Sequence, residues 1–337
     1  MELRTDHPLA ALNSLRLPAR AAFFCRATSA AELVDALAHA RRHDLPVLVL
    51  GGGSNLVFSR DWPGLVVQPA LRGVEVIERD RRRIRLRVAA GEDWPALVER
   101  CLAAGWFGLE NLALIPGSAG AAPVQNIGAY GVELADRLLA VTALERATGE
   151  PVRLSGADCR FGYRESVFKS SPDRYLITAI ELQLDLEPAP VLSYQPLVAA
   201  LERSGVAEPG PRDVFRAVCD LRRAKLPDPA ALPNAGSFFV NPTVDAGRWE
   251  RLRRRHPRLV AFEQPGGGYK LAAGWLIERC GYKGHRQGAI GVSPDQALVL
   301  INHGGATGAE LLALAERIRG AVRETFGVEL AIEPRVI

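Results

Sequence analysis

Two glycine-rich segments contain the residues best suited to bind a charged ligand. The first, GGGSN (51–55), follows the apolar run PVLVL (46–50), and the second spans residues 116–131. Glycine lacks a Cβ and tolerates positive φ, so successive backbone N–H groups can surround a phosphate oxygen. Two such loops can clamp the two halves of a pyrophosphate-bearing cofactor. An ordinary tight turn at GGGSN is the simpler alternative.

GGGSN does not match the commoner nucleotide-binding patterns. A G-x-G-x-x-G motif that begins at Gly51 needs a glycine where Leu56 stands, and no helical pattern follows. A P-loop needs Gly-Lys-Ser/Thr, which the sequence lacks. The segment therefore indicates phosphate binding through backbone groups without selecting either of these nucleotide folds.

Three other short segments carry side chains that could act in catalysis. Arg164 lies in FGYRES, where the alternative is a surface arginine that covers a tyrosine. Ser237 lies in NAGSFFVNP, where the alternative is a β-turn followed by a strand; no G-x-S-x-G motif surrounds it, so acyl transfer has no support. Glu333 and Arg335 could equally be a solvated ion pair on a terminal strand.

Composition favours a globular protein without a metal centre. Of 337 residues, 48% are hydrophobic and 24% charged, and Lys plus Arg exceed Asp plus Glu by only 42 − 38 = 4. That excess is too small to indicate wrapping by nucleic acid. No apolar run approaches the roughly 20 residues that cross a bilayer, and the first residues lack the apolar core of a signal peptide. We expect a cytoplasmic monomer that binds neither nucleic acid nor membranes.

Cysteines and histidines add no metal site to this interpretation. The cysteines are widely spaced, odd in number and form no CxxC pair, which predicts reduced and mostly buried thiols: Cys25, Cys101, Cys159, Cys219 and Cys280. His39 and His43 have helical i,i+4 spacing, but they lie beside Arg41 and Arg42 without a carboxylate motif. A solvated helix face explains them better than a metal pair.

The segments that must position these residues alternate between helices and strands. Ser29 with Glu32, and Thr307 with Glu310, form capping boxes, and Asp93 and Asp213 are expected N-caps. These signals and the apolar spacing predict helices over 29–43, 93–105, 213–225, 271–280 and 307–327. Strands are expected at 46–50, 65–68, 74–88 (a hairpin), 138–145, 175–184, 236–241, 297–302 and at the terminal EPRVI.

The hairpin shows why the fold class is α+β rather than a doubly wound sheet. Ile84, Leu86 and Val88 alternate with arginines at 83, 85 and 87, as in a strand with one solvated face. No aromatic residues interleave for base stacking, which argues against a nucleic-acid patch. Such partly antiparallel strands in the first half favour an α+β fold. KLPDPAALP (225–233) marks an expected domain border.

Taken together and in order, six segments resemble the UDP-N-acetylenolpyruvoylglucosamine reductases. They are GGGSNLVF, GLENLALIPGSAGAAPVQNIGAYGVEL, CRFGYRESVFK, KLPDP, NAGSFFVNP and KLAAGWLIE. Members of this family are flavoenzymes that complete UDP-N-acetylmuramate for bacterial peptidoglycan. The resemblance covers about residues 12–337, and VLSYQPL around Tyr194 resembles the substrate-capping loop of the family's longer form.

The resemblance implies a fold, a domain division and a cofactor. It implies a two-subdomain FAD-binding fold similar to vanillyl-alcohol-oxidase-type flavoproteins, followed by a C-terminal α+β substrate-binding domain. The expected boundaries are 1–70 for the first FAD-binding subdomain, 71–226 for the second (completed by a C-terminal strand, 328–337) and 227–327 for the substrate-binding domain. FAD is expected to bind non-covalently, with NADPH as co-substrate.

Site residues also follow from the resemblance, position by position. The catalytic set matches Arg164, Ser237 and Glu333. Cofactor positions match Gly51, Gly52, Gly53, Ser54, Asn55, Gly117, Ser118, Ala122, Pro123, Asn126, Ile127, Gly128, Arg222 and Arg335. Positions that contact the UDP-sugar match Tyr194, Lys225, Asn241, Lys283 and Gln296. Two departures from the family pattern are the alanines at 121 and 122, where some relatives carry serine, and Pro334 within EPRVI.

The reaction of the family gives these side chains physically sensible roles. Addition of hydride to the vinyl carbon of the substrate delocalises negative charge into its carboxylate, so electrostatic stabilisation should be the largest contribution. A permanently charged, fork-shaped guanidinium at Arg164 suits that task. Ser237 would donate the final proton, and Glu333 would assist only in a protonated or hydrogen-bonded form, with a raised pKa.

Two other functions compete with this hypothesis. One is a flavin oxidase of the same fold, which uses O2; a covalent-flavin histidine is common there, and neither glycine-rich segment contains one. The other is a nucleotide-binding module without chemistry, which leaves the matches at Arg164, Ser237 and Glu333 unexplained. Flavin colour that bleaches with NADPH separates these cases.

Overall fold

Neither of the two units of the structure is a continuous stretch of the chain. The computed structural model describes residues 1–264 and 266–337. Unit 1 consists of Met1–His7, Ala21–Gly52 and Trp62–Arg222, and unit 2 of Pro8–Arg20, Gly53–Asp61 and Arg223–Ile337. The chain therefore changes unit within GGGSN, between Gly52 and Gly53.

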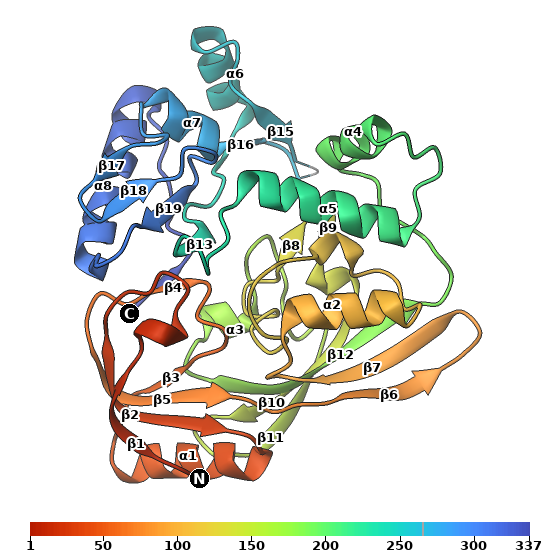
Figure 1. Cartoon of the computed structure of the whole chain (residues 1–337), viewed down its shortest axis with the longest axis vertical. Coiled ribbons are helices and arrows are strands. Elements are labelled where there is room, and N and C mark those ends of the chain that lie inside the picture. Colours follow the sequence, from red (N-terminus) through yellow and green to blue (C-terminus); the bar gives the residue numbers. More distant parts are fainter. Residues whose placement is uncertain (265) are drawn as a thin grey trace. The chain divides into compact units, whose positions relative to one another are not determined.

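The first sheet of unit 1 carries the strand that leads into GGGSN. Its order is β1 (Arg4–Pro8), β2 (Arg20–Ala27), β5 (Trp62–Pro69), β3 (Val47–Val49), and β5 pairs in parallel with both β2 and β3. Helix α1 (Ala30–Arg42) buries Leu33, Ala36, Leu37 and Ala40 against this sheet (Figure 1). Ser29 accepts a hydrogen bond from the Glu32 N–H, as the predicted cap requires.

The second sheet of unit 1 is antiparallel. Its order is β11 (Pro151–Ser155), β10 (Leu138–Glu145), β12 (Tyr175–Asp185), β7 (Arg83–Ala89), β6 (Val74–Arg79). Along β7 the arginines are exposed and Ile84, Leu86 and Val88 are buried, which confirms the predicted alternation. Leu144 and Leu176 of this sheet join the core around α1.

Four helices and several short elements complete unit 1 (Figure 1). The helices are α2 (Trp94–Ala103), α3 (Val167–Ser170), α4 (Gln195–Arg203) and α5 (Pro211–Lys225), whose last three residues cluster with unit 2. The long loop between α2 and β10 contains η2 (Glu110–Leu112), the strand pair β8 (Gly128–Ala129) and β9 (Val132–Glu133), and η3 (Leu134–Asp136). A shared core packs α2, α5 and this loop on the second sheet.

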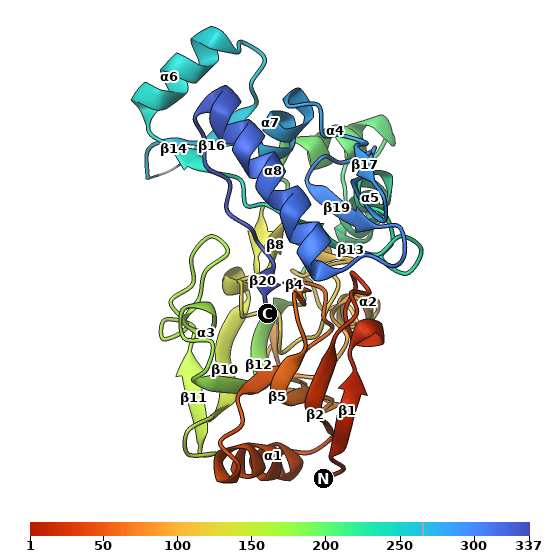
Figure 2. The same cartoon turned by 90° about the vertical axis from the view of Figure 1, so that its left-hand side faces the viewer.

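Unit 2 surrounds its own core with short strands and three helices. One sheet has the order β13 (Asn234–Ser237), β19 (Val299–Asn302), β18 (Ile290–Val292), β17 (Arg286–Gln287). Another has the order β14 (Thr243–Val244), β16 (Tyr269–Leu271), β15 (Ala261–Glu263). The unit also contains η1 (Ala10–Leu12). The helices are α6 (Ala246–Arg255), α7 (Ala273–Arg279) and α8 (Gly308–Phe326). Helix α8, dark blue in Figure 2, contacts β18 and α7. Its Thr307 capping box and the left-handed Gly327 at its end confirm the predicted bounds.

The C-terminal strand lies within EPRVI, as the sequence predicts, but its pairing differs from the expected one. Strand β20 (Arg335–Val336) pairs in parallel with β4 (Leu56–Val57) inside unit 2 and does not complete the second sheet of unit 1. Backbone N–H groups of Arg335 and Ile337 donate to the carbonyls of Asn55 and Val57, at 3.1 and 2.9 Å. The short strand after GGGSN thus offers the backbone edge that this last strand needs.

Two smaller expectations also need correction. Asp213 is not an N-cap: α5 begins at Pro211, and the Asp213 carboxylate accepts from the Gly210 N–H, 3.0 Å away. From the third helical position the carboxylate satisfies the N–H of the residue that precedes the helix, which is half of a capping box. The strand expected over 236–241 ends at Ser237, followed by an isolated bridge between Phe239 and Ile332.

Candidate functional site

The two glycine-rich segments touch each other through backbone in unit 1. A Cβ on Gly52 would lie 2.9 Å from the Gly117 Cα, and a Cβ on Gly51 would lie 3.0 Å from the Ser118 Oγ and 3.1 Å from the Ala121 Cβ. At position 52 the distance to backbone leaves no room for a side chain, whereas at position 51 the neighbouring side chains would have to shift slightly. The structure therefore brings together the two loops that the sequence predicts as a phosphate-binding pair.

Gly53 serves a different purpose from its neighbours. It has a φ of +63°, and a Cβ there would lie only 2.0 Å from the Leu12 carbonyl oxygen, within unit 2. The Gly53 carbonyl accepts from the Ser14 N–H at 3.0 Å. This glycine is required by packing on residues 12–14, whether or not it also lies near a phosphate.

Asn126 ties the second glycine-rich segment to the loop that carries Arg164. It is fully buried, and its Nδ2 donates to the Glu133 carboxylate at 2.7 Å and to the Gly162 carbonyl at 3.2 Å. Its Oδ1 accepts from the Ala135 N–H at 3.0 Å. Because protein groups occupy both ends of this amide, any contact with a cofactor would come from the Asn126 backbone.

Arg164 is held in an uncommon backbone conformation. Its φ is +57°, a region that residues other than glycine seldom adopt. The Lys169 ammonium donates to the Arg164 carbonyl at 2.7 Å, and the Arg164 Nη2 donates to the Gly128 carbonyl at 2.9 Å. One end of the guanidinium is thereby fixed against the second glycine-rich segment.

Arg222, Tyr130 and Tyr194 form a half-buried cluster next to Arg164. The Tyr130 and Tyr194 rings meet edge to face with centroids 5.5 Å apart. Burial lowers the pKa of Arg222, as does the positive charge of Arg164, whereas burial raises the pKa of Tyr130 and of Tyr194. The neighbouring groups that shift the pKa of Arg222 are Tyr130, Cys219 and Arg164, and they include no carboxylate. The cluster is therefore a positive site suited to an anionic ligand.

In unit 2 the structure brings the Ser237 segment alongside Glu333. Ser237 ends β13 and pairs with Val299. The Glu333 N–H donates to the carbonyl of Phe238, the residue after Ser237, at 2.9 Å. Gly236, with a φ of +67°, makes the bend that precedes Ser237. Residues that are almost a hundred positions apart in the sequence thus become neighbours.

Asn241 and Gln296 meet at the start of α7, whereas Lys283 lies beyond its other end. The Asn241 Oδ1 accepts from the Ala273 N–H at 3.0 Å, and the Gln296 Oε1 would lie 2.9 Å from a Cβ on Gly274. Lys283 is exposed and lies 3.5 Å from the Glu278 carboxylate. Among these predicted substrate contacts, the structure groups the first two and separates the third.

The remaining predicted residues have mainly exposed or backbone roles. Lys225, the last residue of α5, and Arg335 on β20 are exposed. Ser54 and Asn55 are half-buried in unit 2, just before β4. In the second glycine-rich segment, Ala122, Pro123 and Ile127 are buried, so they shape the loop and leave its backbone to contact a ligand.

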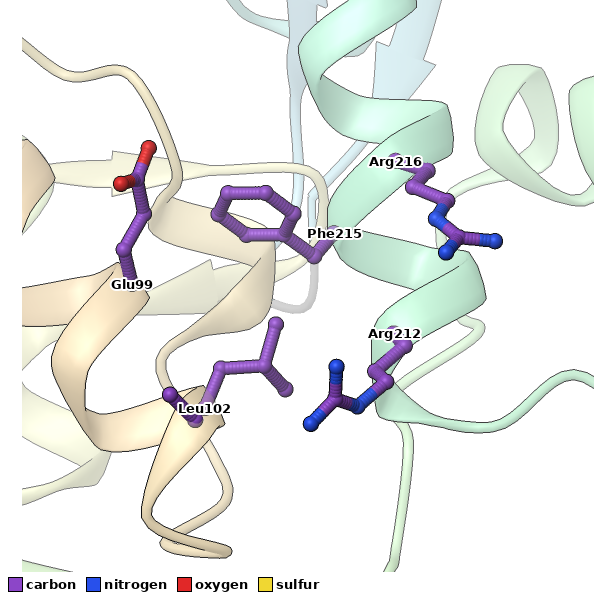
Figure 3. A pocket seen from close by; sticks show the side chains of 6 residues that line it. Glu99, Leu102, Arg212, Phe215 and Arg216 are labelled. Atoms are coloured by element: carbon purple, nitrogen blue, oxygen red, sulfur yellow. The ribbon is translucent and has the colours of Figure 1, made fainter.

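A surface hollow elsewhere in unit 1 contains none of the predicted site residues. It has a volume of about 270 Å³ and lies between α2 and α5, where Figure 3 shows Phe215 and Arg212 extending toward the Leu102 side. In residues 1–264 and 266–337 no three His, Cys, Asp or Glu side chains gather in a way that could hold a metal. The described helices include none with the length and apolar character to cross a membrane.

Sequence reasoning missed two residues of the unit 1 site. Tyr130 packs against Tyr194, and buried Asn111 donates from its Nδ2 to the carbonyls of Tyr130 and Val191, at 2.9 and 3.0 Å. Tyr130 lies in the second glycine-rich segment and Asn111 a few residues before it, but nothing in their spacing marks them, because their partners are up to 80 residues away.

Comparison with known proteins agrees with this geometry. The model of an FAD binding domain matches residues 21–155, and that of the C-terminal domain of UDP-N-acetylenolpyruvoylglucosamine reductase matches residues 228–337. The reductase of that name from Pseudomonas fluorescens is 49% identical over 334 residues, which are 99% of this chain and 98% of the relative. The one from Chromobacterium violaceum is 50% identical over 340 residues, covering 100% and 99% of the two chains.

A solved structure shares the fold over nearly the whole chain. The crystal structure of the reductase from Thermus caldophilus superposes with a TM-score of 0.68 at 24% identity and covers 99% of this chain and 98% of its own. The predicted α+β class, with an FAD-binding part and a C-terminal domain, is confirmed.

The backbone-lined loops and the positive charge at Arg222 fit the phosphates and other anionic groups of a flavin nucleotide. Together with the matched FAD binding domain, they define an FAD-dependent oxidoreductase. The chain belongs to the UDP-N-acetylenolpyruvoylglucosamine reductase family.

Proposed function

We propose that this protein uses NADPH to reduce the enolpyruvyl ether of UDP-N-acetylglucosamine-enolpyruvate to UDP-N-acetylmuramate, in the cytoplasm, for peptidoglycan precursor synthesis. The observation that carries the proposal is the agreement in full length with reductases that are about half identical. We also propose that residues 1–70 and 71–226 form two FAD-binding subdomains and 227–327 the substrate-binding domain, except that residues 8–20 and 53–61 belong to unit 2 together with the latter.

The two touching glycine loops would hold the cofactor. Their backbone N–H groups, including those of Gly51, Gly52 and Gly117, are the donors for the pyrophosphate, since no side chain fits at position 52, where the loops meet. Arg222 and Arg335 would lie near the bound flavin. When bound, FAD accepts a hydride from NADPH and delivers it to the vinyl carbon of the substrate.

Arg164 would stabilise the negative charge that develops on the substrate carboxylate. A guanidinium anchored at one end by the Gly128 carbonyl loses little conformational freedom when its other end meets an oxyanion. Its fixed orientation supports this role, because preorganised charge costs no rearrangement at the moment of reaction.

Ser237 would give the proton to the carbon that bears the ether oxygen, and Glu333 would assist from the neighbouring segment. The backbone bond between Glu333 and Phe238 supports their joint action, since it keeps the two segments in register. Position matters more than acidity for such a donor, because the accepting carbon is strongly basic.

Tyr194, Lys225, Asn241, Lys283 and Gln296 would bind the UDP-sugar. Tyr194 and Lys225 suit the diphosphate, as a hydrogen-bond donor and as a point charge. The hydroxyl of a tyrosine keeps its proton throughout the neutral range, and burial raises the pKa of Tyr194 further, so it remains a donor.

One experiment tests the reaction as a whole. The purified protein should be yellow, should bleach with NADPH under anaerobic conditions, and should regain its colour when the enolpyruvyl sugar nucleotide is added. Mass spectrometry should then find a product heavier by two hydrogens. Colour that returns only with O2 would favour the oxidase alternative, and a colourless protein without flavin would contradict the proposal.

A further inference from the structure

We propose that Asn111 is a positioning residue that holds Tyr194 in place for the sugar nucleotide. Asn111 lies in η2 within unit 1, has 1% of its surface exposed and is not among the residues that the family resemblance marks. The inference rests on the proposed role of Tyr194 and adds the element that orients it.

The amide of Asn111 joins two segments that are far apart in the sequence. Its Nδ2 donates to the Tyr130 carbonyl at 2.9 Å and to the Val191 carbonyl at 3.0 Å. Both N–H groups of one nitrogen are therefore used, one on each segment. Val191 is three residues before Tyr194, so the bond fixes the start of the segment that ends in this tyrosine.

Two further contacts close the same junction. The Tyr130 and Tyr194 rings pack edge to face at 5.5 Å, and a Cβ on Gly131 would lie 3.7 Å from the Tyr194 backbone nitrogen. The two segments thus meet at ring and backbone, with Asn111 bonded to both. Since hydrogen bonds are strongly directional and this amide makes one to each segment, it is the contact best able to fix the geometry.

Burial makes this amide difficult to replace. A partly buried carbonyl that loses its donor still pays a desolvation cost, so residues 191–194 would separate from Tyr130 rather than stay in place unpaired. Tyr194 is also the N-cap residue of α4 and makes no side-chain cap bond there. Helix α4 therefore fixes the backbone that follows Tyr194, and the Asn111 amide fixes the segment that precedes it.

The test uses Asn111→Asp, which keeps the shape but replaces the two N–H donors by carboxylate oxygens facing carbonyls. Binding of UDP-N-acetylmuramate, measured by titration calorimetry, should weaken about ten-fold. Flavin content and the rate of flavin reduction by NADPH should be unchanged. At low pH the introduced carboxyl becomes protonated and regains one donor, so part of the affinity should return.

Two comparisons separate positioning from general destabilisation. Asn302 is 2% exposed and also donates from its Nδ2 to a backbone carbonyl, that of Leu15, at 2.8 Å. Asn302→Asp should lower thermal stability without the ten-fold loss of affinity. In the double variant Asn111→Asp, Tyr194→Phe, affinity should fall little further than in Tyr194→Phe alone, because one residue acts through the other.

The possible failures point to different conclusions. If Tyr194→Phe alone binds normally, the proposed substrate contact is wrong and the inference about Asn111 falls with it. If Tyr194→Phe weakens binding but Asn111→Asp does not, or if their effects simply add, only the positioning role is overturned. Should Asn111→Asp not fold, Asn111→Ser, which can donate to one carbonyl, replaces it; unweakened binding there would overturn the proposal.

Discussion

The α-carbon of Gly117 lies 2.9 Å from the position that a Cβ on Gly52 would take, so the two glycine-rich segments meet backbone to backbone at this point. Because an added carbon cannot fit there without separating the loops, this contact makes the proposed pyrophosphate site open to a direct test.

Gly52→Val should abolish retention of FAD. The side chain would push the first loop away from Gly117 and disturb the N–H groups of both. The ratio of flavin to protein absorbance after gel filtration measures the effect.

The matched control for that change is Gly320→Val in α8, where nothing lies within 4 Å of the added Cβ. It should keep its flavin. Gly53 is a poor choice for this test, because a Cβ there would lie 2.0 Å from the Leu12 carbonyl and would disturb packing whether or not FAD binds. Normal flavin content in Gly52→Val would refute the placement of the pyrophosphate.

Tyr194→Phe should raise the KM for the sugar nucleotide roughly ten- to a hundred-fold, because a hydrogen bond to a charged group is lost. Flavin reduction by NADPH should proceed at its usual rate. Steady-state kinetics with stopped-flow measurement of the first half-reaction gives both values. Tyr175→Phe, on β12 and packed against Phe168, is the control and should change neither; an unaltered KM in Tyr194→Phe would remove the diphosphate assignment.

Ser237→Ala should leave flavin reduction near normal and slow reduction of the sugar nucleotide by about 10² to 10⁴-fold, the usual cost of losing a general acid. Ser237→Cys should keep part of the activity, since a thiol still carries a proton. The two half-reactions are followed separately by stopped flow.

Ser293→Ala, at a buried serine elsewhere in unit 2, is the comparison and should spare both steps. Equal slowing of both half-reactions in Ser237→Ala would mean that this serine shapes the flavin pocket. An unimpaired variant would favour the simple turn followed by a strand.

The stability of the protein should fall as the pH rises above 9, partly through Cys101. Burial raises the pKa of this thiol from 9.0 to about 12. Between these values the unfolded chain releases the proton and the folded chain keeps it, so the contribution is complete below pH 9 and is lost as pH rises. Between pH 8 and 10 this amounts to about 1.4 kcal/mol.

Urea unfolding of Cys101→Ala and of the parent at both pH values measures the difference. Between pH 8 and 10 the free energy of unfolding of Cys101→Ala should fall by about 1.4 kcal/mol less than that of the parent. The half-buried Cys280, as Cys280→Ala, should show a smaller effect. Identical pH dependence in Cys101→Ala and the parent would contradict the assignment.

The sequence predicts best what depends on neighbours three or four positions apart. Ser29, Asp93 and Thr307 all accept from the backbone N–H three residues on, as expected of helix caps. Helix α6 was not predicted, because its arginine-rich segment buries only Trp249 and Leu252 and its apolar periodicity is therefore weak. Helix α4 was not predicted, because its first residues were assigned to the substrate-capping loop by the family resemblance. It has a proline in its first turn.

Contacts between segments that lie far apart in the sequence could be predicted only from the family resemblance, and some of them could not be predicted. The motifs identified Ser237 and Glu333, but their pairing depends on a backbone bond that no local pattern encodes. The contact of Asn111 with Val191 is of the same kind, since its signal is burial and hydrogen bonding in three dimensions. The site residues themselves stay predictions until the variants are measured.

The pairing of β4 with β20 sets a limit on how this chain can fold while it is being made. Leu56 and Val57 leave the ribosome early, but their partners Arg335 and Val336 are synthesised only after the whole of unit 1. Likewise the Leu15 carbonyl accepts a hydrogen bond from Asn302, which is synthesised 287 residues later. Unit 2 therefore cannot complete its fold until β20 has left the ribosome, whereas all residues of unit 1 have been synthesised once the chain reaches Arg222. The first segments of unit 2 to be synthesised stay exposed to chaperones and proteases during that interval.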